Sequence, residues 1–237
     1  MHGDRIEAKL RAKKEIKGNW IALFFTGVLI GLPESVIGAI SSALKENLSD
    51  VGVVAAVTTI LSLLSVAVGI MLLPADAALE KKYLAVARGQ DRQSVSVLCY
   101  YRERDWQEKI KAYFLAGLYT VLGLILCVIP GIFIAVRYSM LGYVFADNPN
   151  IGYRDAMDKC KELTAGRTWE IIVFHLSFIG WHLLAVLTLG ILELWVVPYE
   201  CTAFAAYYDI IRPVEEIKEE PDDIFSEYGK NTDGIVF

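Results

Sequence analysis

Residues 51–75 read VGVVAAVTTILSLLSVAVGIMLLPA, an uncharged run of 25 residues between Asp50 and Asp76. About 20 apolar residues are enough for an α-helix to cross the hydrocarbon layer of a membrane. Two other uncharged runs, 112–136 and 171–192, are also long enough to do so. Three such runs in one chain predict a polytopic, all-α transmembrane bundle.

The composition supports this class of protein. The chain has 237 residues, of which 55% are hydrophobic and 22% charged, and its mean hydropathy is +0.42. The stretches 20–79, 112–146 and 171–211 hold nine charged residues, while the rest of the chain holds the other 42. This segregation of charge excludes an ordinary soluble enzyme, a nucleic-acid-binding protein and a secreted disulfide scaffold.

The turn-forming residues divide the apolar stretches into about six spans arranged as three helical hairpins. Pro33 and Glu34 interrupt the first span, which we expect to be kinked, and a cleaved signal peptide is the alternative interpretation of this segment. Gly190 marks the turn of the third hairpin. The predicted spans are about 20–43, 51–77, 110–123, 124–146, 170–189 and 191–211.

The distribution of lysine and arginine predicts the orientation of these spans. Of the 23 basic residues, 21 lie before Trp20, between Lys81 and Lys111, between Arg154 and Arg167, or from Arg212 onward. All four regions fall on one side of a six-span arrangement. Because basic loops stay in the cytoplasm, we expect both termini to be cytoplasmic and the protein to lie in the plasma membrane.

Three segments outside the spans have their own patterns. Residues 212–237 carry eight acidic and three basic residues and are predicted to form a disordered cytoplasmic tail. The N-terminal segment, 1–17, carries six bases and a stripe of Ile6, Leu10 and Ile16, which predicts either a helix bound to anionic lipid or a solvated topology signal. Residues 153–165 have an apolar stripe at helical spacing that ends at Gly166.

The hairpins resemble one another, which predicts an internal repeat. Each second helix carries a proline after an apolar run, and a tyrosine follows eight or nine residues later. Each first helix begins near a tryptophan, as membrane-interface helices often do. Prolines in spans predict bent helices packed around a shared centre. The repeated residues are Pro74, Pro130 and Pro198, Tyr83, Tyr138 and Tyr207, and Trp20, Trp106 and Trp169.

Charges inside a membrane are costly unless they are paired or hydrated, so they are the first candidates for a functional site. Counted along the helices, Arg137 and Glu200 lie at similar depth, which predicts an ion pair between them. The alternatives are an Arg137 side chain that reaches the membrane surface without an acidic partner, and a solute- or proton-coupled site. The predicted charge network comprises Glu34, Asp76, Arg137 and Glu200.

Two other patterns concern helix packing and histidine. Small residues recur at every fourth position of the first span, a pattern that allows helices to approach closely, either within the chain or in a homodimer. This candidate helix-packing face comprises Gly27, Gly31, Ser35 and Ala39.

His175 and His182 lie seven residues apart on one side of the fifth span, and we expect them to have a hydrogen-bonded structural role.

The sequence predicts no catalytic, cofactor-binding or metal-ligating residue. It contains no GxSxG, GxxxxGK or GxGxxG motif, and its four cysteines lack CxxC spacing. We therefore expect a protein without enzymatic activity.

The first functional hypothesis is a membrane scaffold or regulator, and the alternative is a small-solute or ion transporter or channel. A membrane-embedded enzyme that acts on lipid is a third hypothesis. Expected partners are the lipid bilayer, anionic lipid, and a second copy or another protein, but not nucleic acid.

Four motifs in order resemble a family of bacterial multi-pass membrane proteins, common in Firmicutes, that is catalogued as a domain of unknown function. The resemblance covers residues 5–211 and implies a bacterial plasma membrane and six helices. It assigns no activity to the chain. The chain departs from the family pattern at Cys160 and at 163–166. The motifs are Gly18-Asn19-Trp20, Ile129-Pro130-Gly131 with Tyr138, Leu176-Ser177-Phe178-Ile179-Gly180-Trp181, and Trp195-Val196-Val197-Pro198-Tyr199.

Overall fold

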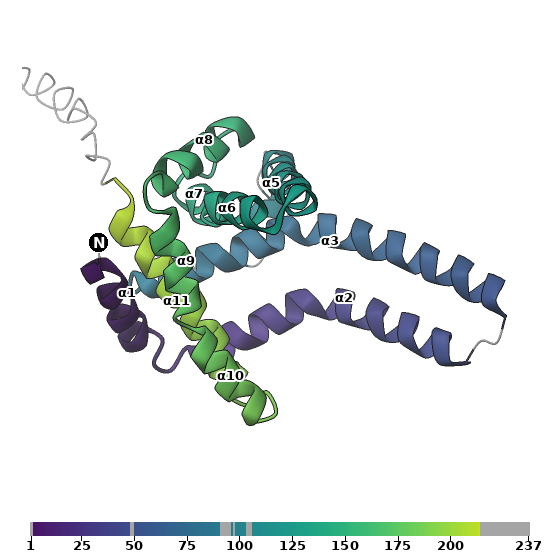
Figure 1. Ribbon diagram of the computed structural model, residues 1–237. Coiled ribbons are helices and arrows are strands. Elements are labelled where there is room, and N and C mark those ends of the chain that lie inside the picture. Colours follow the sequence, from purple (N-terminus) through teal and green to yellow (C-terminus); the bar gives the residue numbers. More distant parts are fainter. Residues whose placement is uncertain (1, 48–49, 91–95, 97, 103–105, 214–237) are drawn as a thin grey trace, which may run out of the picture.

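The computed structural model describes residues 2–47, 50–90, 96, 98–102 and 106–213, and all regular structure in these ranges is α-helical (Figure 1). The predicted all-α class is therefore confirmed. The helices are α1 (His2–Glu15), α2 (Trp20–Asn47), α3 (Val51–Ala87), α4 (Cys99–Arg102), α5 (Trp106–Leu126), α6 (Val128–Tyr138), α7 (Leu141–Asp147), α8 (Tyr153–Thr164), α9 (Thr168–Leu176), α10 (Ile179–Leu187) and α11 (Glu193–Ile211).

Five helical segments in the described part of the chain are long and apolar enough to cross a membrane, so the chain is a multi-pass membrane protein. They are Trp20–Asn47, Val51–Ala87, Trp106–Leu126, Val128–Asp147 and Thr168–Leu187. The sixth predicted span, 191–211, is also helical and forms α11. It is not among the five, and its sequence includes Glu193, Glu200, Asp209 and three tyrosines, which lower its hydropathy.

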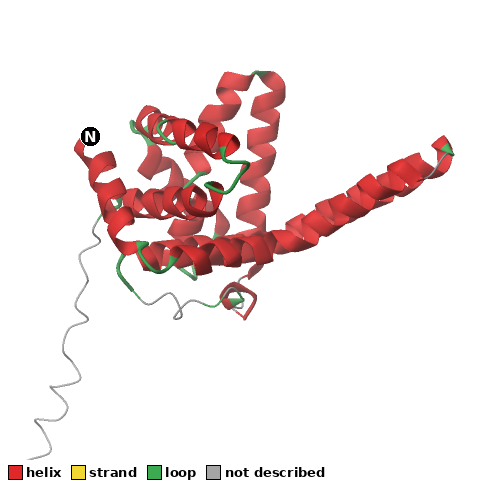
Figure 2. Ribbon diagram, turned by 90° about the horizontal axis from the view of Figure 1, so that it is seen from below, coloured by secondary structure: helices red, strands yellow, loops and turns green. Residues whose placement is uncertain are grey.

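The helices form three hairpins that leave a common region in different directions (Figures 1 and 2). We call them the first hairpin (α2 and α3), the second hairpin (α5 and α6) and the third hairpin (α9, α10 and α11). In Figure 2 the first hairpin projects far beyond the rest of the molecule. In α3, none of the most apolar window of 18 residues is buried within the chain. Lipid or other membrane helices must cover these side chains.

The buried core lies where the hairpins meet, and we call this region the base. Helices α1, α3, α7, α8, α9 and α11 contribute most of it, and α2, α4, α5 and α6 add a few residues. Small side chains let α1, α3 and α11 approach one another closely. The buried alanines on these three helices include Ala8, Ala12, Ala77, Ala78, Ala87, Ala203, Ala205 and Ala206. Tyr83 and Tyr207, two of the repeated tyrosines, are also buried here.

Breaks in the helices follow local sequence signals. The expected boundary at 123 and 124 lies instead at Cys127, because Pro130 falls in the first turn of α6, where a missing amide N–H costs nothing. The third hairpin turns at Gly190, which adopts a φ of +84° as expected for a turn glycine. Proline is tolerated inside three helices, at Pro33, Pro74 and Pro198.

The two amphipathic helices pack against the base. In α8, the expected apolar stripe is buried at Ala156, Met157 and Cys160, and the helix ends before Gly166, which has a φ of +72°. The predicted stripe of the N-terminal segment, however, does not lie on one buried face: Ile16, directly after α1, is buried, whereas Ile6 and Leu10 on α1 are exposed. Alanines supply the rest of the buried face. Of the predicted acidic tail, residues 214–237 lie outside the described residues.

Candidate functional site

Two histidines and two glutamates form a continuous hydrogen-bonded chain on the third hairpin. His175 Nδ1 lies 3.0 Å from Glu200 Oε1, and His182 Nε2 lies 2.9 Å from Glu200 Oε2. His182 Nδ1 lies 2.9 Å from Glu193 Oε1. We call Glu193, His182, Glu200 and His175 the His–Glu ladder. Its four side chains are partly exposed, with Glu200 the most buried at 19% exposure.

The register of two antiparallel segments produces this ladder. The two histidines are seven residues apart, and so are the two glutamates on α11, so each pair lies on one face of its segment. When the segments run antiparallel, His175 lies opposite Glu200 and His182 lies opposite Glu193. The second nitrogen of His182 then reaches diagonally to Glu200. The expected hydrogen-bonded role of the histidines is thereby given specific partners.

The hydrogen bonds of His182 require a proton between its ring and each neighbouring carboxyl group. A neutral imidazole donates one hydrogen bond and accepts one, whereas an imidazolium donates two. His182 lies between two carboxyl groups, so either its ring is positively charged or one of the two carboxyl groups carries a proton. In either case a proton lies between His182 and each of these carboxyl groups. Intramembrane chains of acidic and histidine side chains are the usual means of proton transfer in pumps and transporters.

The structure does not bring Arg137 and Glu200 together, and the predicted ion pair between them is wrong. Both carboxylate oxygens of Glu200 face histidine nitrogens. Arg137 lies on α6 with an exposed side chain, and its backbone carbonyl accepts a hydrogen bond from Thr164 Oγ1 at 3.4 Å. Similar depth in two helices does not place side chains on facing sides of those helices.

The other two predicted charges lie in the first hairpin. Glu34 faces α3, where Ser65 Oγ donates a hydrogen bond of 2.9 Å to Glu34 Oε2. Its carboxylate lies over Gly69, at which a Cβ would come within 2.8 Å of Glu34 Oε1. Asp76 lies near enough to Glu34 for the two charges to interact. These acids are therefore separate from the ladder.

Glu80 is an additional, partly buried acid that sequence reasoning did not find. Tyr113 Oη donates a hydrogen bond of 3.3 Å to Glu80 Oε1. The same two side chains fill the space beside Gly142, in the first turn of α7, where a Cβ would collide with both of them. Glu80 lies directly before Lys81 and Lys82, so the sequence suggested a solvated helix end rather than a buried contact between α3, α5 and α7.

Lys9 on α1 approaches the ladder from the base. Its Nζ donates a hydrogen bond of 2.5 Å to Ser177 Oγ and lies 4.5 Å from the centre of the Phe178 ring. Partial burial lowers the pKa of Lys9, nearby Arg5 lowers it further, and Glu200 acts in the opposite direction. A positive charge from α1 therefore lies within electrostatic reach of Glu200.

Five charged side chains join the inner ends of the first and third hairpins and α7 to α1, and we call them the base ion-pair cluster. Arg88 contacts Asp147 at 2.8 Å and Asp209 at 2.9 Å, while Arg212 contacts Asp147 at 2.8 Å and Arg11 contacts Asp209 at 3.0 Å. Burial disfavours the charged form of Arg88, but hydrogen bonds to the two aspartates outweigh this and raise its pKa. The cluster connects α1, α3, α7 and α11.

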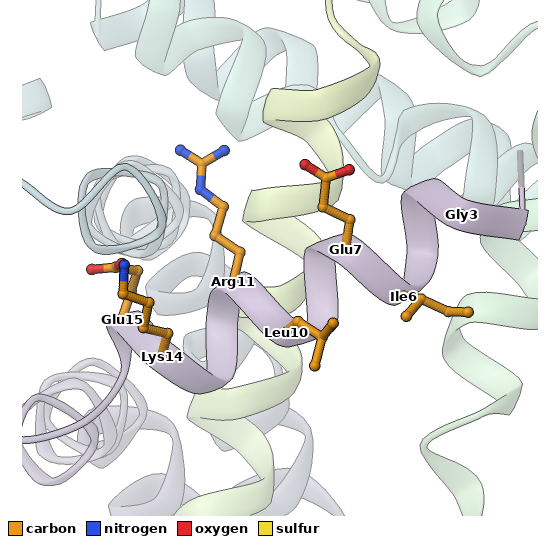
Figure 3. Close-up of a pocket in the computed structure, with 7 residues that line it drawn as sticks. All are labelled: Gly3, Ile6, Glu7, Leu10, Arg11, Lys14 and Glu15. Carbon is orange, nitrogen blue, oxygen red and sulfur yellow. The ribbon is translucent and has the colours of Figure 1, made fainter.

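The outward face of α1 combines apolar and basic side chains, and we call it the basic face. Ile6 and Leu10 are 50% and 65% exposed, and Lys13 and Lys14 are exposed beside them. Figure 3 shows Ile6 and Leu10 projecting from the same side of the helix, along a surface pocket. The pocket is lined by Gly3, Ile6, Glu7, Leu10, Arg11, Lys14 and Glu15.

The predicted small-residue face of α2 contacts the rest of the chain only at one end. A Cβ at Gly27 would lie 3.7 Å from Leu79, whereas a Cβ at Gly31 would have no atom within 4 Å. Ser35 donates a hydrogen bond of 2.9 Å to the carbonyl of Gly31, and both Ser35 and Ala39 are exposed. Of the four residues of this face, only Gly27 is packed against another part of the chain. The use of the face in a homodimer stays a prediction.

The four cysteines are free, and their environments predict different reactivities. Burial raises the pKa of the Cys160 thiol to about 12, so the reactive thiolate is scarce at pH 8. In single-cysteine variants we expect Cys160 to react with a maleimide at least about 100-fold more slowly than exposed Cys127. Stopped-flow or mass-spectrometric labelling in detergent measures both rates. Rates within tenfold of each other would contradict the burial of α8 against the base.

Comparison with known proteins gives one match. No curated protein and no solved structure matches the chain. The matched residues, 106–215, include the second and third hairpins, α7, α8 and all four residues of the His–Glu ladder. The predicted resemblance to an uncharacterised family is confirmed over this part: just under half of the chain matches the family described as protein of unknown function (DUF975).

Proposed function

We propose that this protein is a non-enzymatic membrane scaffold or regulator of the plasma membrane, with the base and both termini on the cytoplasmic side. The observation that supports this proposal best is the way α1 is held. Its alanine face is buried against the base, Arg11 pairs with Asp209, and Arg167 lies 3.6 Å from Asp4. The helix is fixed in position while its basic face stays outward.

Anionic lipid is the partner that best fits the basic face. Ile6 and Leu10 can enter the boundary between headgroups and acyl chains, as the apolar residues of interfacial helices do. Lys13 and Lys14 then lie at the level of the headgroup phosphates. Each lysine near an anionic membrane surface contributes about 1 kcal/mol. The bundle would thus hold a lipid-binding helix at a fixed depth, and α8 and the acidic tail would remain available to protein partners.

Replacing Lys13 and Lys14 with glutamine is expected to weaken the binding of phosphatidylglycerol about 30-fold, because two contributions of about 1 kcal/mol are lost. Native mass spectrometry of the purified protein, titrated with this lipid and with phosphatidylcholine, measures the effect. Lys45→Gln is the control, since Lys45 is exposed in the last turn of α2, far from α1. Equal phosphatidylglycerol binding by the double variant and the wild type would overturn the proposal.

Small-solute or ion transport is the second candidate function, and the His–Glu ladder favours it. Scaffolding alone does not require two histidines and two carboxyl groups to share protons in a membrane helix pair. The ladder is separate from the basic face of α1 apart from Lys9, so the two functions can be tested independently. A homo-oligomer or a protein partner that covers the exposed hairpins is compatible with both.

A further inference from the structure

The His–Glu ladder extends along the third hairpin from its tip toward the base. Glu193 is the first residue of α11, directly after the turn at 188–192, and Glu200 lies seven residues further along, about 10 Å at 1.5 Å per residue. His182 bridges these two acids from α10, and His175 continues the chain on α9. Hydrogen bonds of 2.9 to 3.0 Å join successive members, which is the separation that proton transfer needs.

We propose that Glu193, His182, Glu200 and His175 form a proton-transfer path from the tip of the third hairpin to the base. This activity goes beyond scaffolding and gives the transport alternative a defined ion, the proton. It does not depend on lipid binding by α1. The geometry carries the inference: two acids and two imidazoles from three helices alternate along one line, and each bond joins a carboxyl oxygen to a ring nitrogen.

The protons balance at every step. The Glu193 carboxylate takes one proton from water at the tip and gives it to Nδ1 of His182, whose ring already carries a proton on Nε2. The resulting imidazolium gives its Nε2 proton to Glu200. The ring regains its starting tautomer through water, to which its side chain is 38% exposed, by taking a proton on Nε2 and losing the one on Nδ1. After the carboxyl group of Glu200 rotates, it passes the proton to Nδ1 of His175, which releases its Nε2 proton toward the base and regains its tautomer through water in the same way. One proton enters and one leaves.

The surroundings of the ladder suit this role. Lys9 from α1, with Arg5 beside it, is the cation that acts on Glu200 from the base side. The Phe204 ring lies 4.8 Å from the His175 ring, and Trp195 stacks on Tyr199 at 4.8 Å on the same helix. The Phe204 ring therefore forms an apolar wall beside His175.

Proton flux into liposomes tests the proposal directly. Full-length protein is reconstituted into vesicles that contain the pH dye pyranine, and a valinomycin-driven potassium potential draws protons inward. We expect the wild type to acidify the vesicles at least tenfold faster than protein-free vesicles. Glu200→Gln, which keeps the shape but cannot carry the proton, should reduce the flux to the protein-free level. A wild-type flux equal to that of protein-free vesicles would overturn the path.

Two further variants separate proton transfer from folding. Glu34→Gln removes a membrane acid outside the ladder and should retain flux within twofold of the wild type; a loss equal to that of Glu200→Gln would overturn the assignment. Glu193→Gln changes a side chain that is 34% exposed at the helix start, so folding should tolerate it. Its flux should fall at least tenfold while its helicity and its phosphatidylglycerol binding stay normal. An undiminished flux in Glu193→Gln would overturn the path even if Glu200→Gln fails to fold.

Discussion

Replacing Arg88 with alanine should lower the free energy of unfolding by about 3 kcal/mol, the lower end of the range for breaking a buried ion pair. Arg88 holds two carboxylates that are 14% and 10% exposed, Asp147 and Asp209. Without the guanidinium, Asp209 keeps Arg11 and Asp147 keeps Arg212, but the ion pairs that join α3 to α7 and α11 are lost. Denaturant unfolding in detergent micelles, followed by tryptophan fluorescence, measures the change.

Two companion variants make this prediction specific. Lys161 and Asp158 form an exposed ion pair on α8, so Lys161→Ala should change stability by no more than about 0.5 kcal/mol. Arg88→Lys retains the charge but has no planar fork to hold two carboxylates at once, and its stability should fall between those of the wild type and Arg88→Ala. If Arg88→Ala costs less than about 1 kcal/mol, the cluster does not hold the base together.

The sequence predicted those parts of the fold that depend on the residues of a single helix. An uncharged run of 25 residues and a stripe at three- and four-residue spacing each report on a single helix, and α3 and α8 formed where those patterns lie. Helix breaks were displaced by only a few residues. The boundary predicted at 123 and 124 lies at Cys127, because Pro130 is placed in the first turn of α6.

The parts that the sequence did not predict depend on how helices face one another. Depth along the chain placed Arg137 near Glu200, but α6 directs Arg137 outward, and the histidines take both oxygens of Glu200. A usable signal was present: the spacing of seven residues between His175 and His182 matches that between Glu193 and Glu200 on the antiparallel partner. The base ion-pair cluster gave no such signal, because Arg88 and Asp209 are 121 residues apart.

Gly131→Ala should destabilise the protein by about 2 kcal/mol, because the second hairpin has no room for a Cβ there and overpacking costs about 1 to 3 kcal/mol. At Gly131, a Cβ would lie 2.7 Å from the backbone nitrogen of Leu124, and at Gly123 it would lie 3.0 Å from the Cα of Gly131. The main chains of α5 and α6 are therefore in direct contact. Unfolding in detergent micelles measures the loss.

The same substitution elsewhere in the hairpin should have the opposite sign. Gly117 lies on the exposed side of α5, where a Cβ would meet no atom within 4 Å, so Gly117→Ala should gain up to about 1 kcal/mol from helix propensity. Equal effects at the two sites would show that Gly131 matters only for the turn between α5 and α6. Opposite signs would show that backbone contact holds the hairpin closed. In a bilayer, where lipid removes the hydrophobic drive between helices, such contact is the main source of attraction.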